Sequence, residues 1–246
     1  MKNIALCFDH AGGGTGNPAA LHELLSSDDS QLLWSRTGAA DVGGARTGLR
    51  VRRSREFDAA RTSVTDAYEF LVDRWEPGDR LFVFGAGRGA SCARALARLL
   101  GTVGVLRGTE SAGWTVPDFR EYVLSTYAMP RTRRSAADWK RVARLAAQLS
   151  GSQDATVAVD YLGLWDTVAV PGCSATDALP NVPAARHALA IDGRTRPIPL
   201  GWTAAGVQEV WFRGAHCDVT GGRHACAPLS DITLDWVLDG AVKAGV

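Results

Sequence analysis

Mainly apolar runs alternate along the chain with stretches whose apolar residues recur at helical spacing. The runs lie at 3–8, 31–34, 81–84, 156–165 and 207–212, and they are typical of strands buried on both faces. The helical stretches lie at 18–25, 61–75, 93–100, 114–127, 136–149, 181–191 and 229–242. This alternation predicts an α/β fold with a mostly parallel central sheet flanked by helices.

Two segments depart from this alternation. Residues 37–55 are rich in Gly and Arg and show little periodicity, so we expect a loop or lid there. The helices expected over 114–127 and 136–149 follow one another without a strand, and they indicate a helical insertion near residues 110–150 that could roof a site. Ser135 is placed to open the second of these helices, and Ser230 is placed to cap the last helix of the chain.

Length and charge narrow the class of protein further. The 246 residues, 46% of them hydrophobic, suit one large domain over residues 1–246. With 27 basic and 26 acidic residues the formal charge is +1, which favours neither nucleic acid nor an anionic membrane as a partner. Five scattered cysteines predict a reducing environment, and the start does not read as a signal peptide. We therefore expect a cytoplasmic protein without a membrane span, unless a specialised secretion system exports it; the oligomeric state stays open.

The most informative stretch runs from Leu81 to Leu100, LFVFGAGRGASCARALARLL. An apolar run is followed by glycines at alternate positions, Gly85, Gly87 and Gly89, and then by a helical pattern. A tight turn between a buried strand and a helix is typical of the nucleophile elbow, G-x-S-x-G, of α/β-hydrolases. Gly87 occupies the place of the nucleophilic serine. The sequence therefore predicts the frame of a serine hydrolase without its reactive hydroxyl.

Two further side chains complete the pattern. Asp166 follows the strand expected at 156–165, and His216 follows the strand expected at 207–212. Gly87, Asp166 and His216 thus occur in the order nucleophile, acid, histidine that α/β-hydrolases use. In a working enzyme the histidine removes the proton of the serine, and the carboxylate orients the histidine. Asp166 and His216 can play these two parts, and we expect them within hydrogen-bond reach of each other.

Main-chain N–H groups are the expected donors to a developing oxyanion. By position they belong to Arg88, which follows the nucleophile position, and to the loop near His10 or Ala11. Asp9 ends the first expected strand, and a Gly-rich loop follows over residues 11–17. This loop lacks the ending of a P-loop and the spacing of a dinucleotide fingerprint, so a turn or an oxyanion donor is favoured over a phosphate cradle.

Two other kinds of chemistry are weighed against this one. A metal site would draw its ligands from a cluster near the last strand: His216, Cys217, Asp218, His224 and Cys226. That cluster lacks the paired spacings of zinc sites, so we predict no metal and no cofactor. Ser91 or Cys92 could replace the nucleophile, but both lie one helical turn past Gly87, and a packed core thiol is the favoured interpretation of Cys92.

Six ordered motifs, spread over nearly the whole chain, resemble those of one bacterial family. They are CFDHAGGGTGN at 7–17, DAYEFL at 66–71 with PGDRLFVFGAGRGA at 77–90, YLGLWDTV at 161–168, RHALAID at 186–192, VWFRGAHCDVTGG at 210–222 and LSDITLDW at 229–236. The sequence resembles the α/β-hydrolase family catalogued as domain of unknown function 2235, which includes phospholipase effectors of type VI secretion. The resemblance implies a serine at position 87, the acid at Asp166, the histidine at His216, and Asp9 and Asn17 in the first loop.

Gly87 departs from the family pattern, and three functions follow from this departure. The first, which we favour, is a degenerate hydrolase that binds a small ester or lipid-like ligand without turnover. The second is an active ester or lipid hydrolase, either through water activated by His216 and Asp166 or because its serine has been replaced. The third is a non-catalytic module that contacts another protein through the Arg-rich segment 46–61.

Overall fold

The computed structural model describes residues 1–11, 15–38, 49–107, 115–152, 154–173, 178–193 and 196–246. Its centre is a sheet of six strands in the order β2-β1-β3-β4-β5-β6, and every neighbouring pair is parallel. The strands are β1 (Asn3–Ala11), β2 (Gln31–Gly38), β3 (Arg80–Ala86), β4 (Tyr161–Trp165), β5 (Ala184–Ala190) and β6 (Gly206–Phe212). The predicted α/β architecture with a parallel sheet is therefore confirmed.

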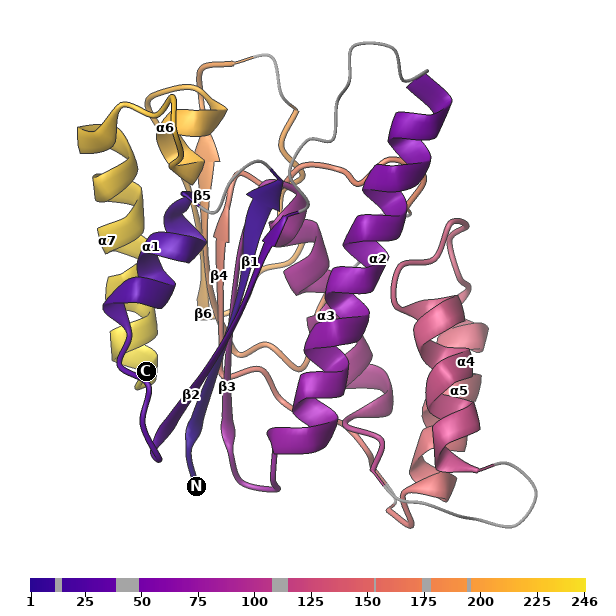
Figure 1. Cartoon of the computed structure of the whole chain (residues 1–246). Coiled ribbons are helices and arrows are strands. Elements are labelled where there is room, and N and C mark those ends of the chain that lie inside the picture. Colours follow the sequence, from indigo (N-terminus) through magenta and orange to yellow (C-terminus); the bar gives the residue numbers. More distant parts are fainter. Residues whose placement is uncertain (12–14, 39–48, 108–114, 153, 174–177, 194–195) are drawn as a thin grey trace.

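Helices cover both faces of the sheet (Figure 1). Those described are α1 (Asn17–Leu24), α2 (Leu49–Arg74), α3 (Arg88–Val103), α4 (Val116–Tyr127), α5 (Ala136–Leu149), α6 (His216–Thr220) and α7 (Ala227–Ala244). On one face, α1 and α7 pack against the strands, with α6 beside α7. On the other, α3 lies against β1 and β3, and α2 and α5 pack on α3. None of the described helices is both long and apolar enough to cross a membrane.

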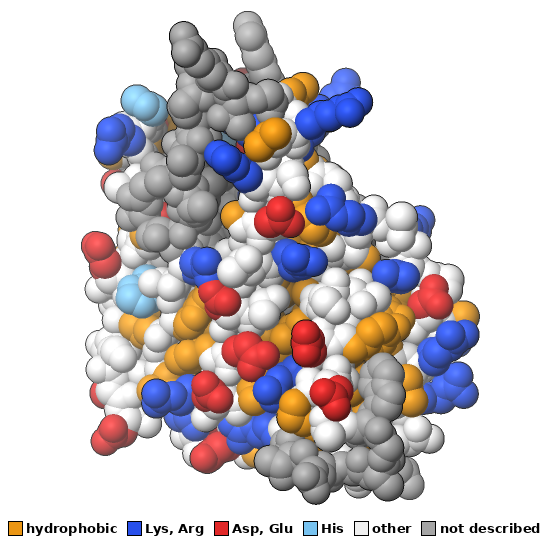
Figure 2. Space-filling view, turned by 45° about the vertical axis from the view of Figure 1, so that its right-hand side comes forward, with side chains coloured by type: hydrophobic (Ala, Val, Ile, Leu, Met, Phe, Trp, Pro, Cys, Tyr) orange, Lys and Arg blue, Asp and Glu red, His pale blue; other side chains and the backbone are white. Residues whose placement is uncertain are grey.

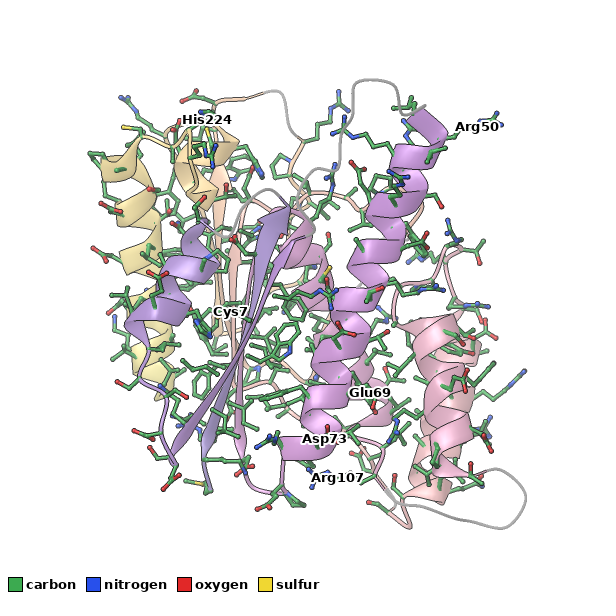
Figure 3. The ribbon with its side chains drawn as sticks, viewed as in Figure 1. Cys7, Arg50, Glu69, Asp73, Arg107 and His224 are labelled. Carbon is green, nitrogen blue, oxygen red and sulfur yellow. The ribbon has the colours of Figure 1, made fainter. Side chains whose placement is uncertain are left out.

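Two apolar clusters fill the spaces between the sheet and its helices. Alternate residues of β1 supply them: Ile4 and Phe8 belong to the cluster under α2 and α3, whereas Ala5 and Cys7 belong to the cluster under α1 and α7. Of these four residues, Cys7 is labelled in Figure 3. The central strands are buried on both faces, which explains their uninterrupted apolar sequences. On the face shown in Figure 2, Lys and Arg side chains alternate with Asp and Glu, in keeping with a formal charge of +1.

The prediction of a loop or lid over residues 37–55 is wrong at both ends of that range. Strand β2 continues to Gly38, and α2 begins at Leu49, while residues 39–48 lie outside the described part. The first two turns of α2 show no apolar periodicity because they are exposed, with Arg50 at the free end of the helix (Figure 3). An ion pair stabilises these turns: Arg52 contacts Glu56, four residues further along the helix.

The helix expected over 181–191 is also wrong, because Ala184–Ala190 forms strand β5. Its sequence, AARHALA, contains good helix formers, so local propensity favours a helix. Packing between β4 and β6 overrides that preference, and five of the seven residues are buried.

Both helices expected in the insertion are present, as α4 and α5. They do not cover the carboxyl ends of the strands. Helix α5 packs on α3, and α4 lies beside α5 on the outer side of α2 and α3 (Figure 1). Ser135 opens α5 as predicted, and its hydroxyl and Asp138 form a capping box. The capping role predicted for Ser230 is wrong: α7 begins three residues earlier, after Cys226, and the Ser230 hydroxyl donates to the Ala227 carbonyl.

Candidate active site

The turn between β3 and α3 has the geometry of a nucleophile elbow. Gly87 sits between the strand and the helix with φ +54° and ψ −116°, a combination that side-chain-bearing residues rarely adopt. The flanking glycines are required by close packing. A Cβ on Gly85 would lie 2.6 Å from the Gly89 carbonyl oxygen, and a Cβ on Gly89 would lie 2.2 Å from the Phe8 carbonyl oxygen. The three alternate glycines are thus explained by sterics at 85 and 89 and by backbone conformation at 87.

The end of β4 is hydrogen-bonded to this turn. The Gly87 N–H donates to the Trp165 carbonyl at 2.8 Å, and the Gly87 carbonyl accepts from the Val168 N–H at 3.0 Å. Asp166 lies between these two contacts, is fully buried and has φ +41°. Positive φ is uncommon for a residue other than glycine, and such strain gathers at functional sites. Main-chain contacts therefore fix Asp166 beside Gly87.

Asp166 and His216 are in direct contact. Nδ1 of His216 lies 2.5 Å from Oδ2 of Asp166, and Oδ1 of Asp166 accepts from the Ala190 N–H at 2.9 Å. His216 is the first residue of α6, a single short helix that the sequence pattern did not predict. With an ionised Asp166, the Nδ1 proton faces the carboxylate, and the lone pair of the neutral ring lies on Nε2. This is the tautomer that a general base needs, since Nε2 can then accept a proton.

The first loop anchors the helix that carries His216. Asn17 is buried, and its side-chain amide donates to the Val219 carbonyl of α6 at 3.0 Å and to Thr233 Oγ1 of α7 at 3.0 Å. Gly16 forms a β-bridge with Gly221, just after α6, and its N–H donates to Asp9 Oδ2 at 3.3 Å. Asn17 and Asp9 therefore position the loop and α6 relative to each other.

The predicted oxyanion donors lie at two element ends. His10 and Ala11 are the last residues of β1, after a register irregularity that begins at Phe8, and residues 12–14 lie outside the described part. Arg88 begins α3, where main-chain N–H groups have no acceptor within the helix. The guanidinium of Arg88 forms an ion pair with Glu56, with 3.4 Å between Nη2 and Oε1. Both main-chain roles stay predictions.

Ser91 and Cys92 point away from a nucleophile's place. The Ser91 hydroxyl donates to the Val168 carbonyl at 2.7 Å, which ties α3 to the segment after β4. Cys92 is buried against α2, with its sulfur 3.7 Å from the Ala60 carbonyl oxygen. Burial raises the pKa of the Cys92 thiol to about 12, so it is protonated near neutral pH. The interpretation of Cys92 as a packed core thiol is confirmed.

The residues considered as metal ligands, near His216 and Cys226, instead form hydrogen bonds that stabilise a turn. Asp218 accepts from the Ala215 N–H and from the Cys226 N–H, both at 2.8 Å, and these bonds lower the pKa of its carboxyl. Cys217 donates to the His224 carbonyl at 3.6 Å. Among the residues that the structure describes, no three His, Cys, Asp or Glu side chains are grouped as metal ligands would be.

A second histidine, His187, is fully buried next to the pair and was missed by the sequence reasoning. The Thr167 N–H donates to Nε2 of His187 at 3.2 Å, so Nε2 is an acceptor and Nδ1 carries the proton that faces Glu209, 2.9 Å away. Burial lowers the pKa of His187, and this outweighs the opposing hydrogen bond to Glu209. His187 thus braces the residue that follows Asp166. The helix expected over 181–191 hid this role, although His187 belongs to the motif RHALAID at 186–192.

Acidification is expected to destabilise the protein through His187. The unfolded histidine gains a proton near pH 6.5, whereas the buried one resists protonation, so the unfolded state binds more protons below that pH. The free energy of unfolding should fall by roughly 1 kcal/mol between pH 7.5 and pH 5.5. Urea titrations at the two pH values measure this loss. Glutamine does not titrate between these pH values, so the His187→Gln variant should lose this part of the pH dependence of the unfolding free energy. An equal change in unfolding free energy in both proteins would show that His187 is not its source.

Comparison with known proteins identifies a family and a yeast relative. Residues 53–240 match the family described as type VI secretion system phospholipase effector, Tle1-like, catalytic domain. The Uncharacterized protein YEL023C of Saccharomyces cerevisiae is 28% identical over 221 residues, which are 78% of this chain and 31% of the yeast protein.

Two solved structures align with this chain over about half of their own length. A crystal structure of an uncharacterized Pseudomonas aeruginosa protein aligns with a TM-score of 0.55 and 17% identity, over 100% of this chain and 46% of the other. The Tle1 effector bound to the VgrG spike of the type 6 secretion system aligns with a TM-score of 0.43 and 15% identity, over 93% of this chain and 52% of the other. The chain spans 31% of the yeast protein and about half of each of these two structures, and by its match over residues 53–240 it belongs to the family of Tle1-like phospholipase effector catalytic domains.

Proposed function

We propose that this protein is a degenerate hydrolase that binds an acyl ester or lipid-like ligand at the β3–α3 turn and does not turn it over efficiently. One observation carries the proposal: an aspartate and histidine pair with 2.5 Å between Oδ2 and Nδ1 is hydrogen-bonded, through the end of β4, to a turn whose nucleophile position is Gly87. The pair can accept a proton, but glycine offers no hydroxyl to attack an acyl carbon.

The surroundings of the pair support binding without nucleophilic attack. Ser91 and Cys92 are engaged with the Val168 and Ala60 carbonyls, so neither supplies a substitute nucleophile. The N–H groups of the first turn of α3 remain a source of donors for a carbonyl oxygen, as in an oxyanion hole. A residual rate on the order of 10³-fold above water is what binding and such donors sustain once a triad nucleophile is lost.

Hydrolysis of an ester panel tests the proposal. Purified protein is assayed against short and long acyl esters at substrate excess, beside the His216→Ala variant, and ligand binding is measured by calorimetry with a non-hydrolysable acyl ether. We expect binding of the ether and turnover far below one cycle per minute by both proteins. Multiple turnovers that His216→Ala abolishes would instead show an active enzyme, and no binding of any acyl compound would also refute the proposal.

A further inference from the structure

The chain leaves β4 through three consecutive main-chain N–H groups, and each of them is hydrogen-bonded. Those of Asp166 and Val168 donate to main-chain carbonyls, at 2.7 and 3.0 Å. Between them, the Thr167 N–H donates to a side chain, at 3.2 Å from Nε2 of His187. Among the described residues, His187 therefore supplies the acceptor at the one position of the three where no main-chain carbonyl does.

The backbone conformation of Asp166 explains why a side chain is needed there. Strand β4 ends at Trp165, and the φ of +41° at Asp166 turns the chain out of the extended conformation. Thr167 follows and is fully buried, so water cannot accept from its N–H. A buried N–H without an acceptor is costly, and a strained residue persists only where its surroundings hold it. The acceptor of the Thr167 N–H is thus part of what holds Asp166 in this conformation.

The ring of His187 is fixed on its other side by β6. Nδ1 lies 2.9 Å from Oε2 of Glu209, and the same oxygen accepts from the Leu200 N–H at 2.7 Å. Because the carboxylate keeps the proton on Nδ1, the lone pair of Nε2 is directed at Thr167. The Thr167 hydroxyl also lies 3.0 Å from Nε2. Both donors of Thr167 therefore reach one ring nitrogen.

This chain of contacts has the order hydroxyl, imidazole, carboxylate, which resembles a catalytic triad. Its burial rules out that role, since Thr167 and His187 are both 0% exposed. A nucleophile has to reach an acyl carbon of the substrate, and a fully buried hydroxyl does not. The contacts of His187 therefore hold their neighbours in place instead of attacking a ligand.

Strand β5 connects His187 to the aspartate and histidine pair. Ala190, three residues after His187 on this strand, donates its N–H to Oδ1 of Asp166 at 2.9 Å. The other oxygen, Oδ2, lies 2.5 Å from Nδ1 of His216. Hydrogen bonds weaken steeply with poor angles and long distances. A main-chain shift at Asp166 and Thr167 would therefore weaken the contact with His216.

We propose that His187 is a positioning residue for the pair: by accepting from the Thr167 N–H, it sets the orientation of Asp166 and so maintains the hydrogen bond between Asp166 and His216. The inference rests on the proposed function only in that it concerns the same pair. Its test uses neither a ligand nor turnover, so a protein that binds no acyl compound would refute the proposed function and leave this result unaffected.

NMR of protein labelled at its histidine nitrogens follows the pair directly. The resonance of the His216 Nδ1 proton is assigned by its loss in His216→Ala. His187→Leu removes the acceptor of the Thr167 N–H, and exchange of the His216 Nδ1 proton with water should become about tenfold faster or more. His187→Gln places an amide oxygen near the position of Nε2 and should restore much of the slow exchange. Unchanged exchange in a folded His187→Leu protein would overturn the proposal.

Tyr161→Phe is the matched control for a general loss of stability. Tyr161 begins β4, at the end far from Asp166, and its buried hydroxyl donates to the Val237 carbonyl at 2.7 Å. This variant also loses one buried hydrogen bond to the main chain, but exchange of the His216 Nδ1 proton should stay within about twofold of that in the unsubstituted protein. Equal acceleration in Tyr161→Phe and His187→Leu would contradict a positioning role.

A second measurement uses the unsubstituted protein. Near neutral pH the His187 Nε2 should give the signal of a nitrogen without a proton, and a proton there would overturn the proposal. Within the described residues, the charged groups that act on the ring are Glu209 on β6, Arg94 on α3 and Asp166 after β4, and burial lowers the pKa of His187 from its usual 6.5. Below pH 6.5, protonation turns Nε2 into a donor. The His216 Nδ1 resonance should shift as His187 titrates; a titration that leaves it in place would contradict the coupling.

Discussion

Gly87→Ser is expected to be labelled covalently by an active-site fluorophosphonate, whereas the unsubstituted protein should remain unlabelled. The reason lies in the backbone, since φ +54° and ψ −116° at position 87 already form the strained turn that presents a nucleophile. A hydroxyl there would join the contact between His216 and Asp166. Turnover of short acyl esters should rise by on the order of 10³-fold or more, because single triad residues account for effects of that size. Labelling and initial rates measure the gain.

Two variants control for strain and for the histidine. Gly87→Ala and Gly87→Ser share the cost of a side chain in this conformation, about 1–3 kcal/mol of unfolding free energy, but alanine has no hydroxyl to label. The double variant Gly87→Ser with His216→Ala has the hydroxyl but lacks the base. Both should stay unlabelled. A folded Gly87→Ser protein that takes up no fluorophosphonate would show that the pair does not serve position 87.

Gly89→Ala is expected to be among the most destabilising single substitutions near the site. The added Cβ would lie 2.2 Å from the Phe8 carbonyl oxygen and 2.9 Å from that of Asp9, so α3 or β1 would have to move. Overpacking against rigid backbone costs about 3 kcal/mol, which lowers the melting temperature by roughly 6–12 °C in a chain of this size. Thermal unfolding followed by circular dichroism measures the shift.

Gly78→Ala provides the matched control for this substitution. Gly78 has φ +97°, but nothing lies within 4 Å of the position its Cβ would take. Only the conformational cost applies there, about 1–2 kcal/mol. If Gly89→Ala is no more destabilising than Gly78→Ala, the close approach of α3 to β1 at Gly89 is not required for stability.

The contact between Asp166 and His216 could be predicted because it depends on strand ends. Parallel strands bring their carboxyl ends to one edge of the sheet, so Gly87 after β3, Asp166 after β4 and His216, four residues after β6, all lie at that edge. Glycine spacing at 85, 87 and 89 identified the elbow for the same kind of reason, since the turn permits few other residues. The catalytic roles of the pair are not tested by the geometry and stay predictions.

Features that depend on packing between distant segments could not be predicted. His187 acquires its role from Glu209 on the neighbouring strand and from the Thr167 N–H, and neither partner is marked by sequence spacing. Strand β5 shows the limit most clearly, since its alanines favour a helix until two neighbouring strands enclose them.

The full burial of Asp166 limits which residues of this site can be exchanged without loss of stability. Its carboxyl group has two partners, the Ala190 N–H and His216, and replacing His216 leaves a buried polar group short of a hydrogen bond. At position 87, in contrast, exchanging serine for glycine relieves backbone strain. A lineage released from selection for hydrolysis would therefore discard its nucleophile first and retain the acid and the histidine for the sake of folding alone.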